Sequence, residues 1–244
     1  MDIQTEYVNL SVDDGTSMRA YVARPSTPRA GLILFQEIFG INSHIRDVTE
    51  RFGREGFLAI APELFHRTGP GFESGYTDMA PGFAHMQQIK DPDLEADIRA
   101  AHGWLQQSGI SRICTTGYCM GGRVSCLAAI TVPVACSVSY YGGGIAPSQF
   151  NPGLLGRLKD LKAPMLFFWG GLDQHIPQES VQTVVSTLKT AGKTYTNVEF
   201  SFADHGFFCD QRASYNPTAA AQAWPLTLAF LAAHTTGQTQ PAGA

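Results

Sequence analysis

The residue best suited to do chemistry is Cys119, which lies at the centre of a Gly-Tyr-Cys-Met-Gly run at 117–121. A β-rich run over 112–115 leads into it, and a helix-compatible run over 124–130 follows. The apex of such a strand–turn–helix is strained, so its neighbours must be nearly free of side chains where strand and helix crowd together. The thiol then lies at a helix N-terminus, which favours an anion. This spacing predicts a nucleophile, and the alternative is a tight turn around a buried thiol.

Three further reactive side chains, Glu37, Asp173 and His205, each lie just past the end of a predicted strand. Ligands bind outside the carboxyl ends of parallel strands, so we expect these side chains to gather around Cys119. The order nucleophile, acid, histidine is the chain order of α/β-hydrolase triads. Cys119 would attack an acyl carbon as a thiolate, and His205 would return the proton to the leaving group. Asp173 would orient the imidazole and stabilise its charged form. Taken singly, the aspartate fits an Asx turn and the histidine a loop turn.

An oxyanion hole should accompany such a nucleophile. We expect one donor to be the N–H of Met120 and the other an N–H after the strand at 30–35, with Ile38 favoured over Glu37. The carboxylate of Glu37 needs its own explanation, because its charge opposes the one that develops in an oxyanion hole. It either caps a loop or helix, or contacts the Cys119 thiol at rest and swings away or takes its proton.

The elements needed to position these residues alternate along the chain. After a hairpin over 6–24, apolar runs predict buried strands at 30–35 and 57–61, and further strands are expected at 112–115, 135–140, 165–169 and 197–202. Helical periodicity places helices between them, and one over 217–233 follows the last strand, with a kink or break at Pro225. Residues 66–82 are rich in glycine and proline and predict an irregular loop. The fold class is therefore α/β, of the α/β-hydrolase type, with a mostly parallel sheet covered by helices on both faces.

The composition narrows the function classes. The 244 residues suit a single domain over 1–234 with a flexible tail at 235–244. The net charge is −4 and the basic residues are scattered, so we expect neither nucleic acid nor membrane as a partner. The start of the chain lacks the features of a signal peptide, which predicts a cytoplasmic protein. Its 5 cysteines show no CxxC or zinc-finger spacing, so we expect free thiols and neither metal nor cofactor. Whether the protein is a monomer or a dimer stays open.

Four motifs together resemble the dienelactone hydrolase (carboxymethylenebutenolidase) family over about residues 5 to 233: QEIFG at 36–40, GYCMGG at 117–122, GGLDQHIP at 170–177 and HGF at 205–207. The resemblance implies an α/β-hydrolase fold and a triad of Cys119, His205 and Asp173. It also implies that Glu37 pairs with the thiol and activates it when substrate binds. The implied reaction is hydrolysis of an enol-lactone, with dienelactone to maleylacetate as the namesake, in bacterial degradation of (chloro)aromatics.

One departure from that family concerns the substrate. Its characterised members hold the substrate carboxylate with two arginines, but residues 68–89 here contain none, and Arg67 lies at the edge of that loop. Arg212 is the candidate for the second arginine, and Phe39, Tyr118 and Phe207 are candidates for an apolar pocket. The leading hypothesis is a small-lactone or ester hydrolase of this family. The alternatives are a general small-ester carboxylesterase and a non-catalytic binding or thiol-sensor protein.

Overall fold

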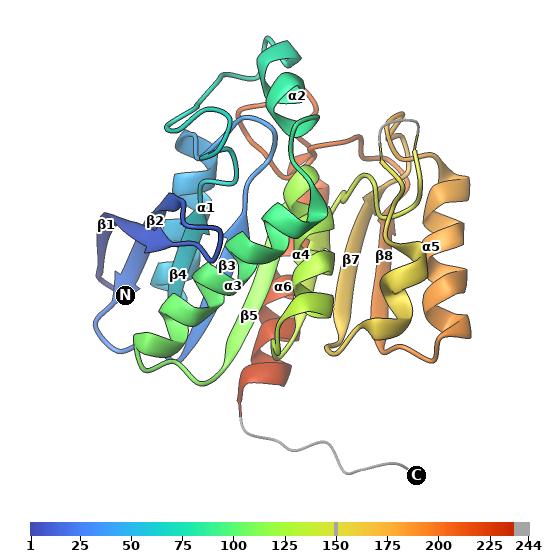
Figure 1. The fold of residues 1–244 in the computed structure, drawn as a ribbon. Coiled ribbons are helices and arrows are strands. Elements are labelled where there is room, and N and C mark those ends of the chain that lie inside the picture. The colour runs from blue at the N-terminus through green and yellow to red at the C-terminus, as the bar shows by residue number, and fades with distance from the viewer. Residues whose placement is uncertain (149–150, 237–244) are drawn as a thin grey trace.

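The computed structural model describes residues 1–148 and 151–236, which form an eight-stranded sheet with helices on both faces (Figure 1). The strand order is β1-β2-β4-β3-β5-β6-β7-β8. The pairs β1–β2 and β2–β4 are antiparallel and the other pairs are parallel. The strands are β1 Ile3–Ser11, β2 Ser17–Pro25, β3 Ala30–Phe35, β4 Phe57–Pro62, β5 Ile113–Tyr118, β6 Ser137–Tyr140, β7 Met165–Gly170 and β8 Tyr195–Phe200. The predicted fold class is confirmed.

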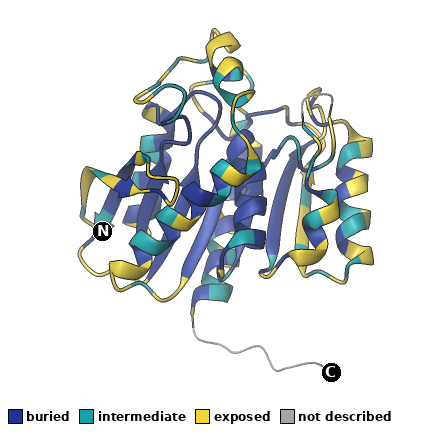
Figure 2. Cartoon of the chain, in the orientation of Figure 1, coloured by how far each residue is buried: buried dark blue, intermediate teal, exposed yellow. Residues whose placement is uncertain are grey.

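Five of the six inner strands, β3 to β7, carry most of the core. Every residue of β3 to β7 is buried, and Figure 2 shows these strands uniformly dark between helices whose outer faces are exposed. Strands buried on both faces read as unbroken apolar runs, which is why the sequence located them. The edge strands β1 and β8 have mostly exposed or half-buried residues, as expected where one side lacks a neighbour.

The helices are α1 Ser43–Arg54, α2 Ala80–Met86, α3 Asp91–Gln107, α4 Met120–Thr131, α5 Gln178–Thr190 and α6 Pro217–Thr235, with a 3-10 turn η1 at Leu155–Asp160. In Figure 1, α3 and α4 lie in front of the sheet and α1 and α6 behind it. Helix α1 is capped by Asn42, whose side chain accepts from the Ile45 N–H at 3.2 Å. Ser43, which follows the cap, is the first helical residue.

The structure departs from the sequence expectations at several element ends. Helix α2 forms inside and beyond the segment expected to be irregular, and β8 ends at Phe200 rather than at 202. Helix α6 is one continuous helix, although Pro225 lies inside it, so the break we considered is absent. From 237 onward the expected tail lies outside the described residues. No helix of the described chain has the length and apolar character needed to cross a membrane.

Candidate active site

Cys119 occupies a sharp turn between β5 and α4. Its backbone has φ 56° and ψ −120°, in the left-handed region that favours glycine. A Cβ at Gly117 would overlap the carbonyl oxygen of Gly121, and one at Gly121 would overlap that of Phe35. Only glycine at both positions lets α4 start this close to β5 and β3. The strained cysteine at the N-terminus of α4 is the arrangement expected of a nucleophile held on a rigid turn.

His205 and Asp173 form a buried pair beside this turn. The Nδ1 atom of His205 lies 2.7 Å from Oδ2 of Asp173. The other carboxylate oxygen accepts the N–H groups of His175 at 2.8 Å and Ile176 at 3.1 Å. With both oxygens held, Asp173 fixes the orientation of the imidazole and leaves its Nε2 available for Cys119.

The electrostatics of this pair favour a charged imidazole. Burial lowers the pKa of His205, but interaction with Cys119 and hydrogen bonding to Asp173 outweigh it and raise the pKa to about 10. For Asp173, burial raises the pKa. The hydrogen bond from His205 and the positive charge of that ring outweigh burial, so the pKa of Asp173 lies below its ordinary value. An imidazolium next to a cysteine sulfur stabilises the thiolate, which is the nucleophilic form.

The two residues expected to supply the oxyanion donors, Ile38 and Met120, lie at the same cavity as the thiol. Within the described chain, the backbone N–H of neither residue donates a hydrogen bond. The loop that carries Ile38 is backed by α2, because a Cβ at Gly82 would overlap the Ile38 carbonyl oxygen. The helix therefore supports the position of the loop that carries Ile38.

Glu37 is fully buried and bound on both carboxylate oxygens. Arg212 donates from Nη1 to Oε1 at 3.0 Å, and the Tyr76 hydroxyl donates to Oε2 at 3.2 Å. Among the described residues, no hydrogen bond joins Glu37 to Cys119. Burial lowers the pKa of Arg212, but the charges of Glu37 and Cys119 outweigh it, so the pKa is raised. In this structure the carboxylate is withdrawn from the thiol, whereas we had considered a direct contact.

A cavity of about 550 Å³ opens in front of the thiol. Of the expected substrate contacts, Phe39 and Arg212 line it. Tyr118 and Phe207 do not, since both are fully buried among core aromatic rings. Arg67 also lies elsewhere, because its guanidinium binds the carboxylates of Asp14 and Asp97.

Sequence reasoning missed two parts of the cavity wall. One is the apolar side of α2 and of the residue before it, which contributes Met79, Phe83 and Met86. The other is Arg123 on α4, which binds Asp91 at 2.8 Å and the Asn151 side chain at 3.1 Å. Arg123 is the only charged residue in α4 and lies one turn after Cys119. That position is the feature of the sequence from which its place in the cavity wall could have been predicted.

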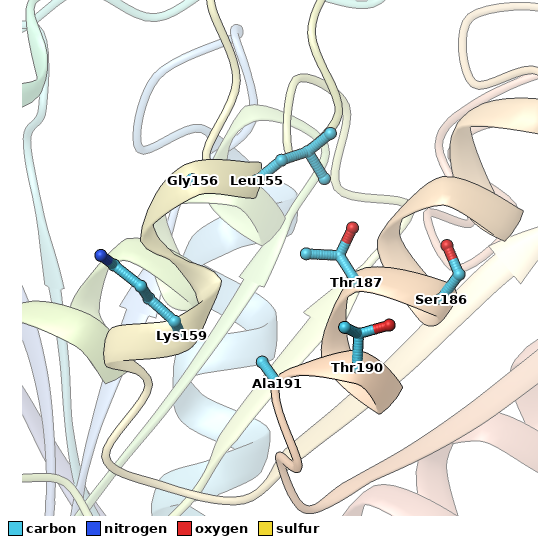
Figure 3. Close-up of a pocket in the computed structure, with 7 residues that line it drawn as sticks. All are labelled: Leu155, Gly156, Lys159, Ser186, Thr187, Thr190 and Ala191. Atoms are coloured by element: carbon cyan, nitrogen blue, oxygen red, sulfur yellow. The ribbon is translucent and has the colours of Figure 1, made fainter.

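A second hollow lies between η1 and α5 (Figure 3). Its lining consists of one leucine, one lysine and residues that are small or carry a hydroxyl group, and it includes no member of the Cys119 site. The candidate catalytic residues Cys119 and His205 line the larger cavity instead. The lining of the second hollow is Leu155, Gly156, Lys159, Ser186, Thr187, Thr190 and Ala191.

Comparison with known proteins agrees with this geometry. The model of the Dienelactone hydrolase family matches residues 18–235. The chain belongs to the dienelactone hydrolase family. A Synechocystis protein named "Putative carboxymethylenebutenolidase" is 37% identical, with 92% of this chain and 94% of that protein covered. An Escherichia coli O157:H7 protein of the same name is 36% identical, with 86% and 80% covered.

Solved structures place the chain in the same family of folds. The crystal structure of a "Putative Dienelactone Hydrolase" from Klebsiella pneumoniae has a TM-score of 0.87 and 34% identity, covering 95% of this chain and 99% of that one. A dienelactone hydrolase-like phosphotriesterase, P91, from metagenomic libraries has a TM-score of 0.81 at 19% identity, which shows the fold alone. The protein is thus a dienelactone hydrolase family member with the α/β-hydrolase fold, in a family of hydrolases.

Proposed function

We propose that this protein is a cysteine-dependent hydrolase that opens a small enol-lactone or ester, with dienelactone to maleylacetate as the first reaction to examine. The observation that carries the proposal is the strained Cys119, which lies at a helix N-terminus beside the His205–Asp173 pair. It lines a cavity of about 550 Å³ with two unused backbone N–H donors. These are a nucleophile, a proton carrier with its orienting acid, and an oxyanion site.

The reaction would run in two halves. The Cys119 thiolate attacks the acyl carbon. The resulting oxyanion accepts hydrogen bonds from the N–H groups of Ile38 and Met120. The C–O bond of the ester breaks, the leaving oxygen takes the proton of His205, and a thioester remains on the sulfur. A water molecule then loses a proton to His205 and attacks the thioester, which releases the acid and regenerates the thiolate.

The test is steady-state hydrolysis of cis- and trans-dienelactone and of p-nitrophenyl acetate by Cys119→Ala and Cys119→Ser variants. We expect kcat/KM to fall by a factor of about 10³ or more in the alanine variant, because the covalent route is removed. Cys126→Ala is the matched control, since Cys126 is a buried thiol on the same helix but does not line the cavity. Unchanged turnover in Cys119→Ala would refute the assignment, and turnover by the unmodified protein would exclude a purely binding or sensing role.

A specific observation favours a second candidate, a carboxylesterase for neutral esters. Both arginines that line the cavity are already paired, Arg123 with Asp91 and Arg212 with Glu37. The α2 wall opposite is apolar, so in the described part of the cavity no arginine is left without a carboxylate partner for an acidic substrate. An acidic lactone would have to compete with a protein carboxylate for its cation.

A substrate panel at low and high salt separates the two candidates. A preference for acidic lactones that weakens with salt indicates a cationic clamp, and a salt-independent preference for neutral esters indicates the second candidate. Met79→Arg adds a cation to the α2 wall, and Met79→Leu is its control. If the protein is a carboxylesterase for neutral esters, Met79→Arg should raise kcat/KM for the acidic lactone about fivefold or more relative to the neutral ester.

A further inference from the structure

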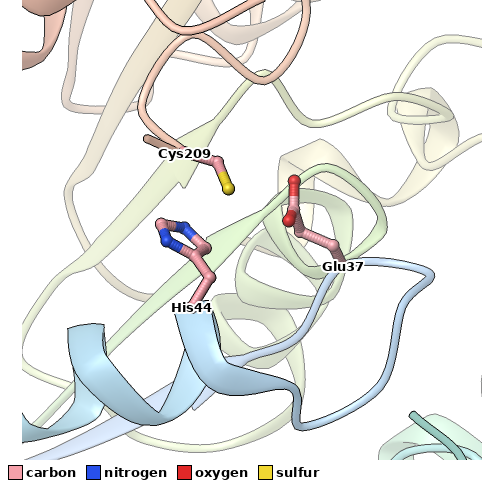
Figure 4. Close-up of side chains that lie close together, drawn as sticks. All are labelled: Glu37, His44 and Cys209. Atoms are coloured by element: carbon pink, nitrogen blue, oxygen red, sulfur yellow. The ribbon is translucent and has the colours of Figure 1, made fainter. Parts of the chain in front are cut away.

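Behind the catalytic cavity, three side chains from separate segments converge (Figure 4). Glu37 comes from the loop after β3, His44 from the first turn of α1, and Cys209 from the loop after β8. One oxygen, one ring nitrogen and the sulfur all lie within 4.8 Å of one another. All three side chains are buried, so this cluster of an O, an N and an S donor is closed off from bulk water.

The ring nitrogens of His44 are not used in any hydrogen bond within the described chain. The residue is 1% exposed, and neither Nδ1 nor Nε2 has a hydrogen-bond partner among the described residues. The nearest carboxylate oxygen, on Asp210, is 3.9 Å from Nδ1, which is too far for a hydrogen bond. A buried polar group without a hydrogen-bond partner destabilises the folded protein, so such a group calls for an explanation. Figure 4 shows the ring facing the sulfur and the carboxylate.

We propose that Glu37, His44 and Cys209 form a binding site for a zinc-class divalent cation. Zinc binds thiolate sulfur at about 2.3 Å and imidazole nitrogen or carboxylate oxygen at about 2.0–2.2 Å. The three donor atoms need to approach one another by only about 1 Å to reach those distances in a tetrahedral arrangement. Magnesium and calcium prefer oxygen ligands, so the nitrogen and the sulfur select against them. The donors are far apart in the sequence, and spacing rules for metal sites therefore do not detect them.

The surrounding charges make this a site of moderate affinity. Binding releases the Cys209 proton to solvent, and the thiolate with the Glu37 carboxylate balances the two positive charges of the metal. Arg212, 3.0 Å from one Glu37 oxygen, remains as an opposing charge. The metal would bind the other oxygen and displace the Tyr76 hydroxyl from it. Glu37 directly precedes Ile38, the proposed oxyanion donor. Zinc bound to Glu37 would therefore also affect the active site.

The experiment measures zinc binding in a Cys119→Ala background, which removes the catalytic thiol as a competing ligand. Metal content after equilibrium dialysis against zinc chloride should give one zinc per chain. Cobalt in place of zinc should give a thiolate-to-cobalt charge-transfer band. Adding Cys209→Ala should abolish that band and weaken zinc binding by at least about tenfold, since even outer partners of metal ligands are worth about 10–100-fold.

The matched control is Cys136→Ala, since Cys136 is equally buried and its sulfur lies 3.4 Å from that of Cys114, a pair of thiols outside the proposed site. This control should bind zinc normally. Circular dichroism checks that each variant is folded, and His44→Gln provides a second test if Cys209→Ala is not. The proposal is overturned if the background protein binds no zinc, if Cys209→Ala and His44→Gln bind it unchanged, or if Cys136→Ala loses it.

Discussion

At the scale of single residues, the proposed chemistry depends on how the neighbours of Cys119 are held. Both oxygens of Asp173 are engaged, one by the His205 ring and the other by two backbone N–H groups. The aspartate is therefore fixed before substrate arrives, and it fixes the imidazole in turn. Glu37 is likewise fixed, but by Arg212 and Tyr76 and not by the thiol.

Asp173→Asn should keep the shape of the site but remove the charge that orients and stabilises the imidazolium. We expect kcat/KM to fall by a factor of about 10²–10⁴, the upper value being that of an aspartate-to-asparagine change in a serine protease triad. Steady-state kinetics measure it, with Asp160→Asn as control because Asp160 is exposed and outside the cavity. A loss of less than about threefold would remove Asp173 from the mechanism.

The pH dependence follows from the raised pKa of His205, about 10 in the folded protein. An ordinary histidine titrates near about 6.5, so the imidazolium and the stability it contributes are fully present below that pH and are lost as the pH rises through about 10. We expect kcat/KM to hold to about pH 9 and then to fall. In Cys119→Ala, the attraction of the sulfur is gone, and an NMR titration should find the pKa of His205 lowered. An alkaline limb near pH 6.5 in the unmodified enzyme would contradict this account.

At the scale of elements, the site is assembled where strands end and helices begin. The sequence predicted the Cys119 turn, because the glycines at 117 and 121 and the flanking runs act locally. It also placed Asp173 after β7, because a strand buried on both faces leaves a plain apolar run. The strand before His205, β8, is mostly exposed or half-buried, and the sequence located it without such a run. It missed α2, since Pro81 and Gly82 mark a loop in a sequence pattern while, in the structure, proline occupies the first turn of a helix.

Gly82→Ala tests whether α2 positions the oxyanion donor. The added methyl would overlap the Ile38 carbonyl oxygen, so the loop must shift or α2 must move away. We expect kcat to fall about 10-fold or more while the circular dichroism spectrum is retained, because displacing an oxyanion donor costs about 2.7–4 kcal/mol at most.

The control for Gly82→Ala is Gly103→Ala in α3, where a Cβ meets no atom within 4 Å. This variant should keep full activity and gain about 0.5–1 kcal/mol of stability from the better helix former. Equal kcat in the two variants would show that the packing of α2 does not matter to the donor.

At the scale of the whole molecule, contacts distant in sequence could not be read from local patterns. The pairing of Arg212 with Glu37, the place of Arg123 on the cavity wall and the meeting of Glu37, His44 and Cys209 all depend on how the elements pack. Aromatic residues next to the motifs were ambiguous for the same reason: Phe39 lines the cavity, while Tyr118 is core.

The single sheet through the described chain predicts that residues 1–234 unfold as one domain. The three tryptophans report on different parts of it, Trp104 in α3, Trp169 in β7 and Trp224 in α6. Their fluorescence and the far-ultraviolet circular dichroism should follow one denaturant transition with the same midpoint. Two separated midpoints would instead indicate parts that unfold independently.

The central claim is that the sulfur of Cys119 becomes acylated during turnover. The direct measurement is rapid acid quenching during hydrolysis of p-nitrophenyl acetate, followed by peptide mass spectrometry. We predict an acetyl thioester on the peptide that contains residues 117–121, absent from Cys119→Ala and still present in Cys126→Ala. Turnover with the acetyl group on another residue, or with no acyl-enzyme and full activity in Cys119→Ala, would contradict the account.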